Sequence, residues 1–357
     1  MITVDVVMPT GGSAGGGVET ILYEWSRNIP DDEIRLRFFH ISPGQADYLK
    51  GYKDQWTLPM PEEGMDKLTL EYCAKAYAFF VQQQGAPDIC LATWIPLVSM
   101  ACRAVRDSLE LSFPVISFIH SVISAYEPYG LGGMKELSAA DGHICISKII
   151  ENEILSADPN AFTLNLGNPI NPVEINEYAP DDRTICFAGR LAPEKNVDYI
   201  IQAIAKAKDK NWKLLIAGKG VFMESLKQLS KELGVEDRVT FLGWLEKPWE
   251  SMKKARFCAL ASDYEGCNGT TREASSIGMT VISTPVGGVV DYIVPGVNGY
   301  LYSKDKVENL TTILDGISDG ILPICDTDAC KKSVEPYHTD KYFANLKNIF
   351  KSLVAND

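Results

Sequence analysis

The sequence predicts an α/β protein made of two doubly wound domains. Short apolar runs typical of buried strands alternate with segments of helical length along the whole chain. The alternation is interrupted by a Pro- and Asn-containing stretch, residues 168–180, and then starts afresh. The chain has 357 residues, of which 46% are hydrophobic, and this is enough to fill two separate cores.

Ten apolar runs are the predicted strands, five in each half. In the first half they are residues 2–8, 35–41, 89–93, 115–120 and 142–147; in the second half they are residues 184–189, 213–218, 238–243, 257–262 and 280–284. A last helix-like segment, from about residue 340 to 354, has no strand after it and is expected to close the fold. We therefore expect a first domain over residues 1–170, a second over 171–338 and a C-terminal helix over 339–357.

A glycine run follows the first predicted strand and precedes a helix-like segment, residues 18–25. Its members are Gly11, Gly12, Gly15, Gly16 and Gly17. The run lacks the G-x-G-x-x-G spacing of a dinucleotide site and the Lys-Ser/Thr pair of a Walker loop, so both of these sites are excluded. Two interpretations are left: a backbone that closely approaches a phosphate or sugar, or a flexible turn that binds no ligand.

Charge and composition exclude several classes of protein. The net charge of −13 argues against nucleic-acid binding, which needs clustered Lys and Arg. Residues 1–172 hold 11 Lys and Arg against 21 Asp and Glu, so a strong electrostatic membrane anchor is not expected. Local pairs such as Arg35 with Arg37, or Arg103 with Arg106, could still contact a membrane, or could simply be solvated.

The expected location is the cytoplasm, with at most loose association with the inner face of the membrane. The N-terminus lacks a basic region followed by an apolar segment, and no apolar run approaches bilayer length. Nine cysteines occur without the spacing of a zinc site or a disulfide framework, which favours a reducing compartment. The Asp326-x-Asp328 pair is interpreted as part of a loop in preference to a magnesium site, so no metal is expected.

Two glutamates flank a glycine-bearing turn after the predicted strand 257–262. We expect a helix to begin near Thr270, with Thr270 or Thr271 as its N-cap, which would place Glu273 in the first turn. Glu265 lies before the turn. Because open α/β sheets bind ligands at the carboxyl ends of their strands, these carboxylates are candidates for binding sugar and ribose hydroxyls.

Two cations follow the first strand of the second half. Arg190 comes just after the strand 184–189, and Lys195 just before a helix-like segment with an apolar face. A forked guanidinium and a compact ammonium could together hold a diphosphate. The alternative is that each is solvated or pairs with a surface acid such as Glu194, but the nearby glycines and acids favour the diphosphate.

Four segments together resemble one enzyme family. They are GGVE at 16–19, GRLAPEKN at 189–196, the Glu265 and Glu273 pair, and VGGVVDYIVPGVNGYLY at 286–302. This combination is similar to the retaining glycosyltransferases of group 1, which have the GT-B fold and include bacterial lipopolysaccharide-core and exopolysaccharide enzymes. The stretch GWLEKPWE at 243–250 is especially similar to the lipopolysaccharide α-1,6-galactosyltransferase branch.

The resemblance implies two Rossmann-like domains that face a central cleft, with the C-terminal helix crossing back to the first. It implies an acceptor-side first domain and a nucleotide-sugar-binding second domain. Catalytic roles would belong to His120, Arg190, Lys195 and Glu265. Donor contacts would come from Gly16, Gly17, Arg190, Lys195, Gly243, Trp244, Gly266, Cys267, Asn268, Gly269, Thr270 and Glu273. For His120, which ends a predicted strand, the alternative is a purely structural histidine.

The implied activity is transfer of a hexose, with retention and without metal or other cofactor, from UDP-galactose, UDP-glucose or UDP-N-acetylglucosamine. The acceptor would be a cell-surface glycan or a lipid-linked oligosaccharide. The alternatives are a non-catalytic partner subunit with this fold, and a transferase for a small soluble acceptor or a related phosphorylase-like enzyme. The family usually has bulky apolar and small residues between the two glutamates, whereas this chain has Cys267, Asn268 and Arg272 there. The sugar pocket is therefore expected to be more polar, with Asn268 as a candidate determinant of the donor.

Overall fold

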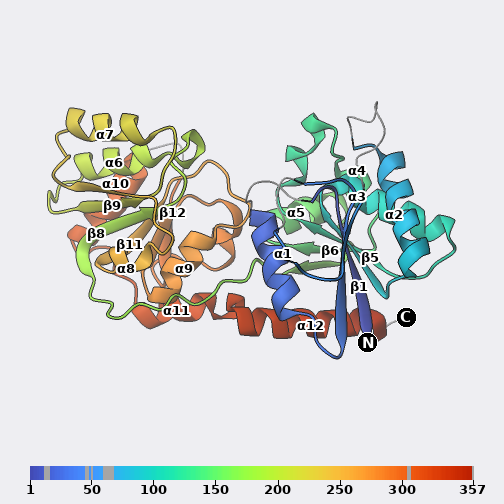
Figure 1. Cartoon of the computed structure of the whole chain (residues 1–357). Coiled ribbons are helices and arrows are strands. Elements are labelled where there is room, and N and C mark those ends of the chain that lie inside the picture. The colour runs from blue at the N-terminus through green and yellow to red at the C-terminus, as the bar shows by residue number, and fades with distance from the viewer. Residues whose placement is uncertain (12–16, 45–47, 50, 59–67, 304–306, 356–357) are drawn as a thin grey trace. The chain divides into compact units, whose positions relative to one another are not determined.

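The computed structural model describes residues 1–11, 17–44, 48–49, 51–58, 68–303 and 307–355. The chain forms two compact units. Unit 1 consists of residues 1–169 and 340–357, and unit 2 of residues 170–339. Each unit contains a parallel sheet flanked by helices (Figure 1).

In the described part of unit 1, seven parallel strands lie in the order β3-β2-β1-β4-β5-β6-β7. Their bounds are β1 Ile2–Met8, β2 Ile34–His40, β3 Gln55–Thr57, β4 Ile89–Trp94, β5 Val115–Ile119, β6 Gly142–Cys145 and β7 Thr163–Asn165. The strand order reverses between β1 and β4, which is the doubly wound arrangement that the alternating pattern predicts.

The helices of unit 1 are α1 Gly17–Asn28, α2 Leu70–Gln84, α3 Pro96–Ser108, α4 Met134–Leu137 and α5 Lys148–Ala157. A buried ion pair ties two strands to α2: Arg37 Nε on β2 donates to Asp5 Oδ1 on β1 at 2.6 Å. The other guanidinium nitrogens of Arg37 donate to the carbonyls of Gln84 and Gly85 at the end of α2.

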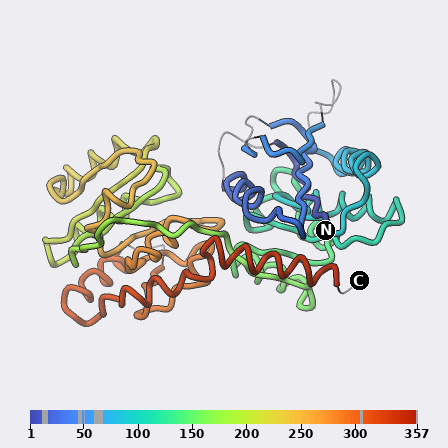
Figure 2. The backbone as a smooth tube through the Cα atoms, turned by 60° about the horizontal axis from the view of Figure 1, so that its bottom comes forward, coloured from blue at the N-terminus to red at the C-terminus, as the bar shows by residue number. Residues whose placement is uncertain are grey.

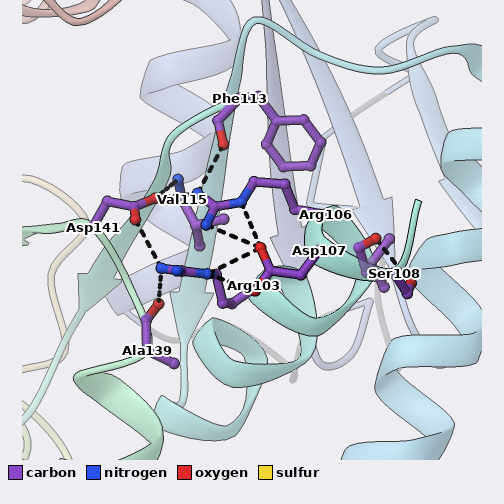
Figure 3. Close-up of polar contacts among 9 residues, drawn as sticks. Arg103, Arg106, Asp107, Ser108, Phe113, Val115, Ala139 and Asp141 are labelled. Atoms are coloured by element: carbon purple, nitrogen blue, oxygen red, sulfur yellow. Dashed lines mark hydrogen bonds and ion pairs between the residues drawn. The ribbon is translucent and has the colours of Figure 1, made fainter. Parts of the chain in front are cut away.

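The basic pairs considered for membrane contact are neutralised within unit 1. Arg103 on α3 bonds to Asp107 and Asp141 at 2.9 Å, and Arg106 bonds to Asp141 at 2.7 Å (Figure 3). Arg35 forms a bidentate pair with Asp54 at 2.7 and 2.8 Å. These arginines thus link elements of the unit to one another.

The chain returns to unit 1 as the last helix, α12 Thr339–Ala355 (Figure 2). The Phe350 ring packs edge-on against Trp25 of α1, with ring centroids 6.2 Å apart. Lys347 Nζ donates to Asp31 at 2.7 Å, just before β2. This bond lowers the pKa of Asp31 to about 2.

In the described part of unit 2, six parallel strands lie in the order β10-β9-β8-β11-β12-β13. Their bounds are β8 Asp181–Ala188, β9 Lys213–Ala217, β10 Val239–Gly243, β11 Ala255–Leu260, β12 Thr280–Ser283 and β13 Gly299–Leu301. The helices are α6 Val197–Lys206, α7 Met223–Glu232, α8 Trp249–Met252, α9 Gly269–Ile277, α10 Val307–Ser318 and α11 Thr327–Val334. Helix α6 packs against α7 and α10, and α9 packs against α11.

Two features of the fold differ from the sequence prediction. The short edge strands β3, β7 and β13 were not predicted, because three residues are too few to show a strand pattern. The Asp326–Asp328 stretch is not a loop: Asp326 Oδ1 accepts from the backbone N–H groups of Asp328 and Ala329 and so caps α11. No helix in the described part of the chain is long and apolar enough to span a bilayer.

Candidate functional site

In unit 2, the loops after β8 and β9 meet backbone to backbone in a way that only glycine permits. A Cβ atom on Gly218 would lie 1.9 Å from the carbonyl oxygen of Gly189, and one on Gly220 would lie 2.1 Å from that of Leu191. The Leu191 N–H also donates to the Lys219 carbonyl at 2.9 Å. The two loops therefore form one surface at the carboxyl edge of the sheet.

A cavity of about 780 Å³ opens at this edge, within the size range of small-molecule sites. The loops after β8, β9 and β10 and the start of α9 line it. Its polar and aromatic lining residues are Arg190, Lys219, Trp244, Trp249, Thr270 and Glu273. The side chain of Trp244 is 61% exposed, and Lys219 Nζ lies 5.4 Å from its ring centroid. An aromatic face, a cation and a carboxylate thus surround one cavity.

Glu273 is held in place in the wall of this cavity. Trp249 Nε1 donates to Glu273 Oε2 at 2.8 Å. Burial raises the pKa of Glu273, and the Trp249 hydrogen bond partly offsets this rise. A carboxylate fixed in this way can accept hydrogen bonds from the hydroxyls of a ligand.

A second pocket, of about 270 Å³, adjoins the first and shares Arg190 and Thr270 with it. Here Lys195 Nζ donates to Glu265 Oε1 at 2.6 Å, and Ser262 Oγ donates to the same oxygen at 2.8 Å. The side chains of Lys195 and Glu265 are only 15% and 12% exposed. A cation and a carboxylate therefore lie together on the pocket wall.

Arg190 has features of both roles considered from the sequence, namely diphosphate binding and pairing with Glu194. It lines both pockets, yet its Nη2 also donates to Glu194 Oε1 at 3.1 Å. Its side chain is 72% exposed, and exposed ion pairs contribute at most about 1 kcal/mol. The guanidinium can therefore turn from Glu194 to an anionic ligand at little cost.

The N-cap of helix α9 lies two or three residues earlier than predicted. Its N-cap is Asn268, whose Oδ1 accepts from the Thr271 N–H at 2.8 Å, so the prediction of Thr270 or Thr271 as the cap was wrong. Glu273 is consequently the fifth residue of the helix and lies beyond the first turn. The shift arises because asparagine is a strong N-cap and the glycine after it can adopt helical geometry.

A glycine turn at residues 287–288 packs under the loop that carries Glu265. A Cβ on Gly287 would lie 2.9 Å from both Cβ and the carbonyl oxygen of Glu265. A Cβ on Gly288 would lie 2.6 Å from Nη2 of Arg272. Because neither glycine has a side chain, the turn can pack closely against Glu265 and Arg272 beneath the smaller pocket.

The two pockets gather most of the predicted donor-site residues. Arg190, Lys195, Glu265, Cys267, Asn268, Gly269 and Thr270 line the smaller one, and Trp244 and Glu273 line the larger. Gly243 and Gly266 lie beside the pockets without lining them. Gly243 has a φ of +70° and accepts the Gly218 N–H on its carbonyl at 2.7 Å.

The remaining predicted residues belong to unit 1. His120 directly follows β5, and its ring packs against Phe118 at 4.2 Å. Its Nε2 is buried with no hydrogen-bond partner in the described structure, and burial lowers the pKa of His120 to about 3. Gly17 begins α1 and is exposed, whereas Gly16 lies outside the described residues.

Sequence reasoning missed three contributors to the larger cavity and its neighbour: Lys219, Trp249 and Ser262. A signal existed for Lys219, since it lies between two glycines directly after a predicted strand. Among the described residues, no cluster of three or more His, Cys, Asp or Glu side chains could hold a metal ion.

Comparison with known proteins agrees with this geometry. A model of the glycosyl transferases group 1 family matches residues 173–319. The lipopolysaccharide 1,6-galactosyltransferase of Salmonella typhimurium is 30% identical over 251 residues, covering 66% of this chain and 69% of that enzyme. The chain belongs to the group 1 glycosyltransferases. The Escherichia coli enzyme of the same name is 28% identical over 289 residues, covering 76% of this chain and 77% of its own. The family predicted from the sequence is therefore confirmed, and the chain is a glycosyltransferase.

Solved structures of other glycosyltransferases confirm the predicted GT-B fold. The lipopolysaccharide outer core galactosyltransferase WaaB in its apo form superposes with a TM-score of 0.86 at 22% identity, covering 98% of this chain and 99% of its own. Anabaena Alr3699/HepE in complex with UDP gives a TM-score of 0.76 at 18% identity, covering 98% and 100%.

Proposed function

We propose that this glycosyltransferase moves a hexose from a UDP-sugar to a cell-surface glycan or a lipid-linked oligosaccharide, with retention of anomeric configuration. One observation carries the proposal: two adjoining pockets in unit 2, one with the size and lining for a nucleoside and one with a cation and a carboxylate for a sugar diphosphate. The donors we expect are UDP-galactose, UDP-glucose and UDP-N-acetylglucosamine.

Each part of the donor has matching groups. Glu273 accepts hydrogen bonds from the ribose hydroxyls, and Trp249 orients its carboxylate. Arg190, which lines both pockets, and Lys195, which lines the smaller one, bind the diphosphate where the two pockets adjoin. Glu265 accepts a hydrogen bond from a hydroxyl of the transferred sugar, and Ser262 and Lys195 hold its Oε1 in place by donating to it.

The chemistry follows from the charges that develop as the bond breaks. Negative charge grows on the leaving diphosphate and oxocarbenium character grows on the sugar. Arg190, Lys195 and the N–H groups at the start of α9 stabilise the leaving group, so the reaction needs no metal. Glu265 is assigned to sugar binding and not to nucleophilic attack, because the front-face mechanism that the resemblance implies needs no second carboxylate as nucleophile.

His120 would act as a neutral imidazole. A pKa of about 3 keeps the ring uncharged at neutral pH, so in the catalytic role that the resemblance implies it would supply no positive charge. The relatives support the acceptor class, since two of them are lipopolysaccharide galactosyltransferases. For such an activity we expect the chain to be cytoplasmic, with at most loose association with the inner face of the cell membrane.

The test is a panel of sugar nucleotides incubated with the purified chain in the presence and absence of EDTA. We expect release of UDP from at least one UDP-hexose, unchanged by the chelator, and an α-linked product by NMR when an acceptor is added. Loss of activity in EDTA with recovery in magnesium would contradict the metal-free mechanism. A chain that hydrolyses and transfers nothing would instead be a non-catalytic partner subunit, and turnover only with soluble acceptors would overturn the proposed acceptor class.

A further inference from the structure

We propose that Arg272 is a positioning residue: through its bond to Cys267 it holds the wall of the donor-sugar pocket in place. This inference rests on the proposed function, because it assigns the smaller pocket of unit 2 to the sugar. Arg272 is fully buried and does not line either pocket, although it lies between the two glutamates that do. A buried arginine at such a position needs a reason, since desolvating a charge is costly unless it is bonded.

The first contact of Arg272 is with the pocket wall. Its Nη1 donates to Cys267 Sγ at 2.8 Å, and Cys267 lines the smaller pocket beside Glu265 and Asn268. The loop of residues 265–268 is therefore bonded at its midpoint to a side chain beneath it. A shift of the guanidinium would move the sulfur and the loop with it.

The second contact is with the glycine turn. Nη2 of Arg272 occupies the space that a Cβ on Gly288 would take, at 2.6 Å, while Gly287 packs against Glu265. One turn thus touches Arg272 on one side and the sugar-binding glutamate on the other. Arg272 supports the position of Glu265 by this route as well as through Cys267.

The guanidinium is itself braced from the far side. It lies 3.8 Å from the ring centroid of Tyr337 and 5.8 Å from that of Tyr292, and its Nη2 is 3.9 Å from Asp291 Oδ2. Stacking on an aromatic face needs the planar guanidinium, which lysine lacks. The brace therefore depends on arginine and not on positive charge alone.

Glu273, the next residue on α9, makes it possible to separate an effect on sugar binding from an effect on UDP binding. Glu273 bonds to Trp249 in the larger cavity, whereas Arg272 points beneath the smaller pocket. A change at Arg272 should therefore weaken binding of the sugar part of the donor and leave UDP binding nearly unchanged. A purely structural role would weaken both together.

The experiment measures Kd for UDP and for the UDP-hexose that the wild type uses, by calorimetry, in Arg272→Lys, Cys267→Ala and their double variant. A misplacement of about 1 Å can lower the rate of a reaction about a hundredfold. For binding we expect a smaller effect: the ratio of Kd for UDP-hexose to Kd for UDP should rise about tenfold in each single variant. We expect the double variant to show no larger rise, because both changes break one linkage.

Two further variants test the brace and the specificity of the effect. Tyr337→Leu removes the stacking face without touching the pocket and should raise the same ratio, while Tyr337→Phe should restore it. Arg183→Lys is the matched control: Arg183 pairs with Asp209 at 2.7 Å and lies 5.4 Å from the Trp212 ring, away from both pockets. Its ratio should equal that of the wild type.

An unchanged ratio in folded Arg272→Lys and Tyr337→Leu would overturn the inference alone, and so would an equal loss of UDP affinity. If Arg272→Lys does not fold, the Tyr337 pair decides. A wild type that binds UDP but no UDP-hexose overturns the proposed function and this inference together.

Discussion

The two units share the order of their first six strands, with β7 added in unit 1, and the cations compared lie at opposite edges of the two sheets. In unit 1, Arg35 and Arg103 pair with acids that lie just before strands, namely Asp54 before β3 and Asp141 before β6. These pairs are at the amino edge of the sheet. In unit 2, Arg190 and Lys219 follow strands β8 and β9, and both line a cavity at the carboxyl edge.

The difference shows that position relative to the strand ends separates cations that pair with acids of the fold from cations that line a cavity. At the amino edge, a pair such as Arg103 with Asp141 fastens a helix to a strand. At the carboxyl edge, the loops diverge and leave a cavity where a cation can meet a ligand. Charge alone does not distinguish the two, since Lys195 is also paired, with Glu265.

The largest expected effect separates these two classes of cation. Lys195→Ala should lower turnover about a hundredfold or more, because it removes the positive charge that stabilises the leaving diphosphate. Arg103→Ala should leave turnover within about twofold, because its pair is partly exposed to solvent and Arg103 lines neither pocket of unit 2. The measurement is the steady-state rate of UDP release for the two variants. Equal rates of UDP release for Lys195→Ala and Arg103→Ala would contradict the proposed difference between cations at the carboxyl and amino edges of the sheets.

An intermediate effect is expected at Glu273. Glu273→Gln should weaken UDP binding about tenfold, because a carboxylate accepts stronger hydrogen bonds from ribose hydroxyls than an amide does. Since burial raises the pKa of Glu273, the wild type should lose more UDP affinity than the Gln variant as pH falls through that raised value, because protonation of the terminal phosphate of UDP affects both proteins alike. Calorimetry with UDP across pH 4–7 checks both points. Parallel pH curves for the two proteins would contradict the assigned role.

Much of the fold could be predicted from the sequence, because long buried strands carry a strong apolar signal. All ten predicted runs are strands, and the first, β1 Ile2–Met8, has the predicted bounds. The edge strands β3, β7 and β13 were not predicted because each is only three residues long. β3 and β7 are also partly exposed, whereas two of the three residues of β13 are buried.

The candidate site was predictable where a residue type fits a motif, and not where contact depends on tertiary packing. Arg190, Lys195 and the two glutamates were expected, and the structure brings all four to the walls of two adjoining pockets. The residues between the glutamates were expected to line a sugar pocket, and Cys267 and Asn268 line the smaller pocket of unit 2. The burial of Arg272 on Tyr337 could not be foreseen, because the two positions are 65 residues apart.

The smallest expected effect concerns another pair at the amino edge of unit 1. Lys347→Ala on α12 should destabilise the helix by at most about 1 kcal/mol, because its pair with Asp31 is partly exposed. Hydrogen exchange of the α12 amides is the measurement, since it reports local opening in a chain of two units.

The pH dependence of this pair gives a check with a definite sign. Asp31 has its pKa lowered from 3.8 to about 2, so its contribution is present above about pH 4 and is lost as pH falls towards 2. The difference between wild type and Lys347→Ala should therefore be constant from pH 7 to 5 and shrink by pH 3. In an Asp31→Asn background the difference should be small at every pH. A Lys347 effect that persisted undiminished at pH 3 would mean that the lysine acts through packing along its stem and not through Asp31, and the amino-edge pairs would then have to be regarded as packing contacts.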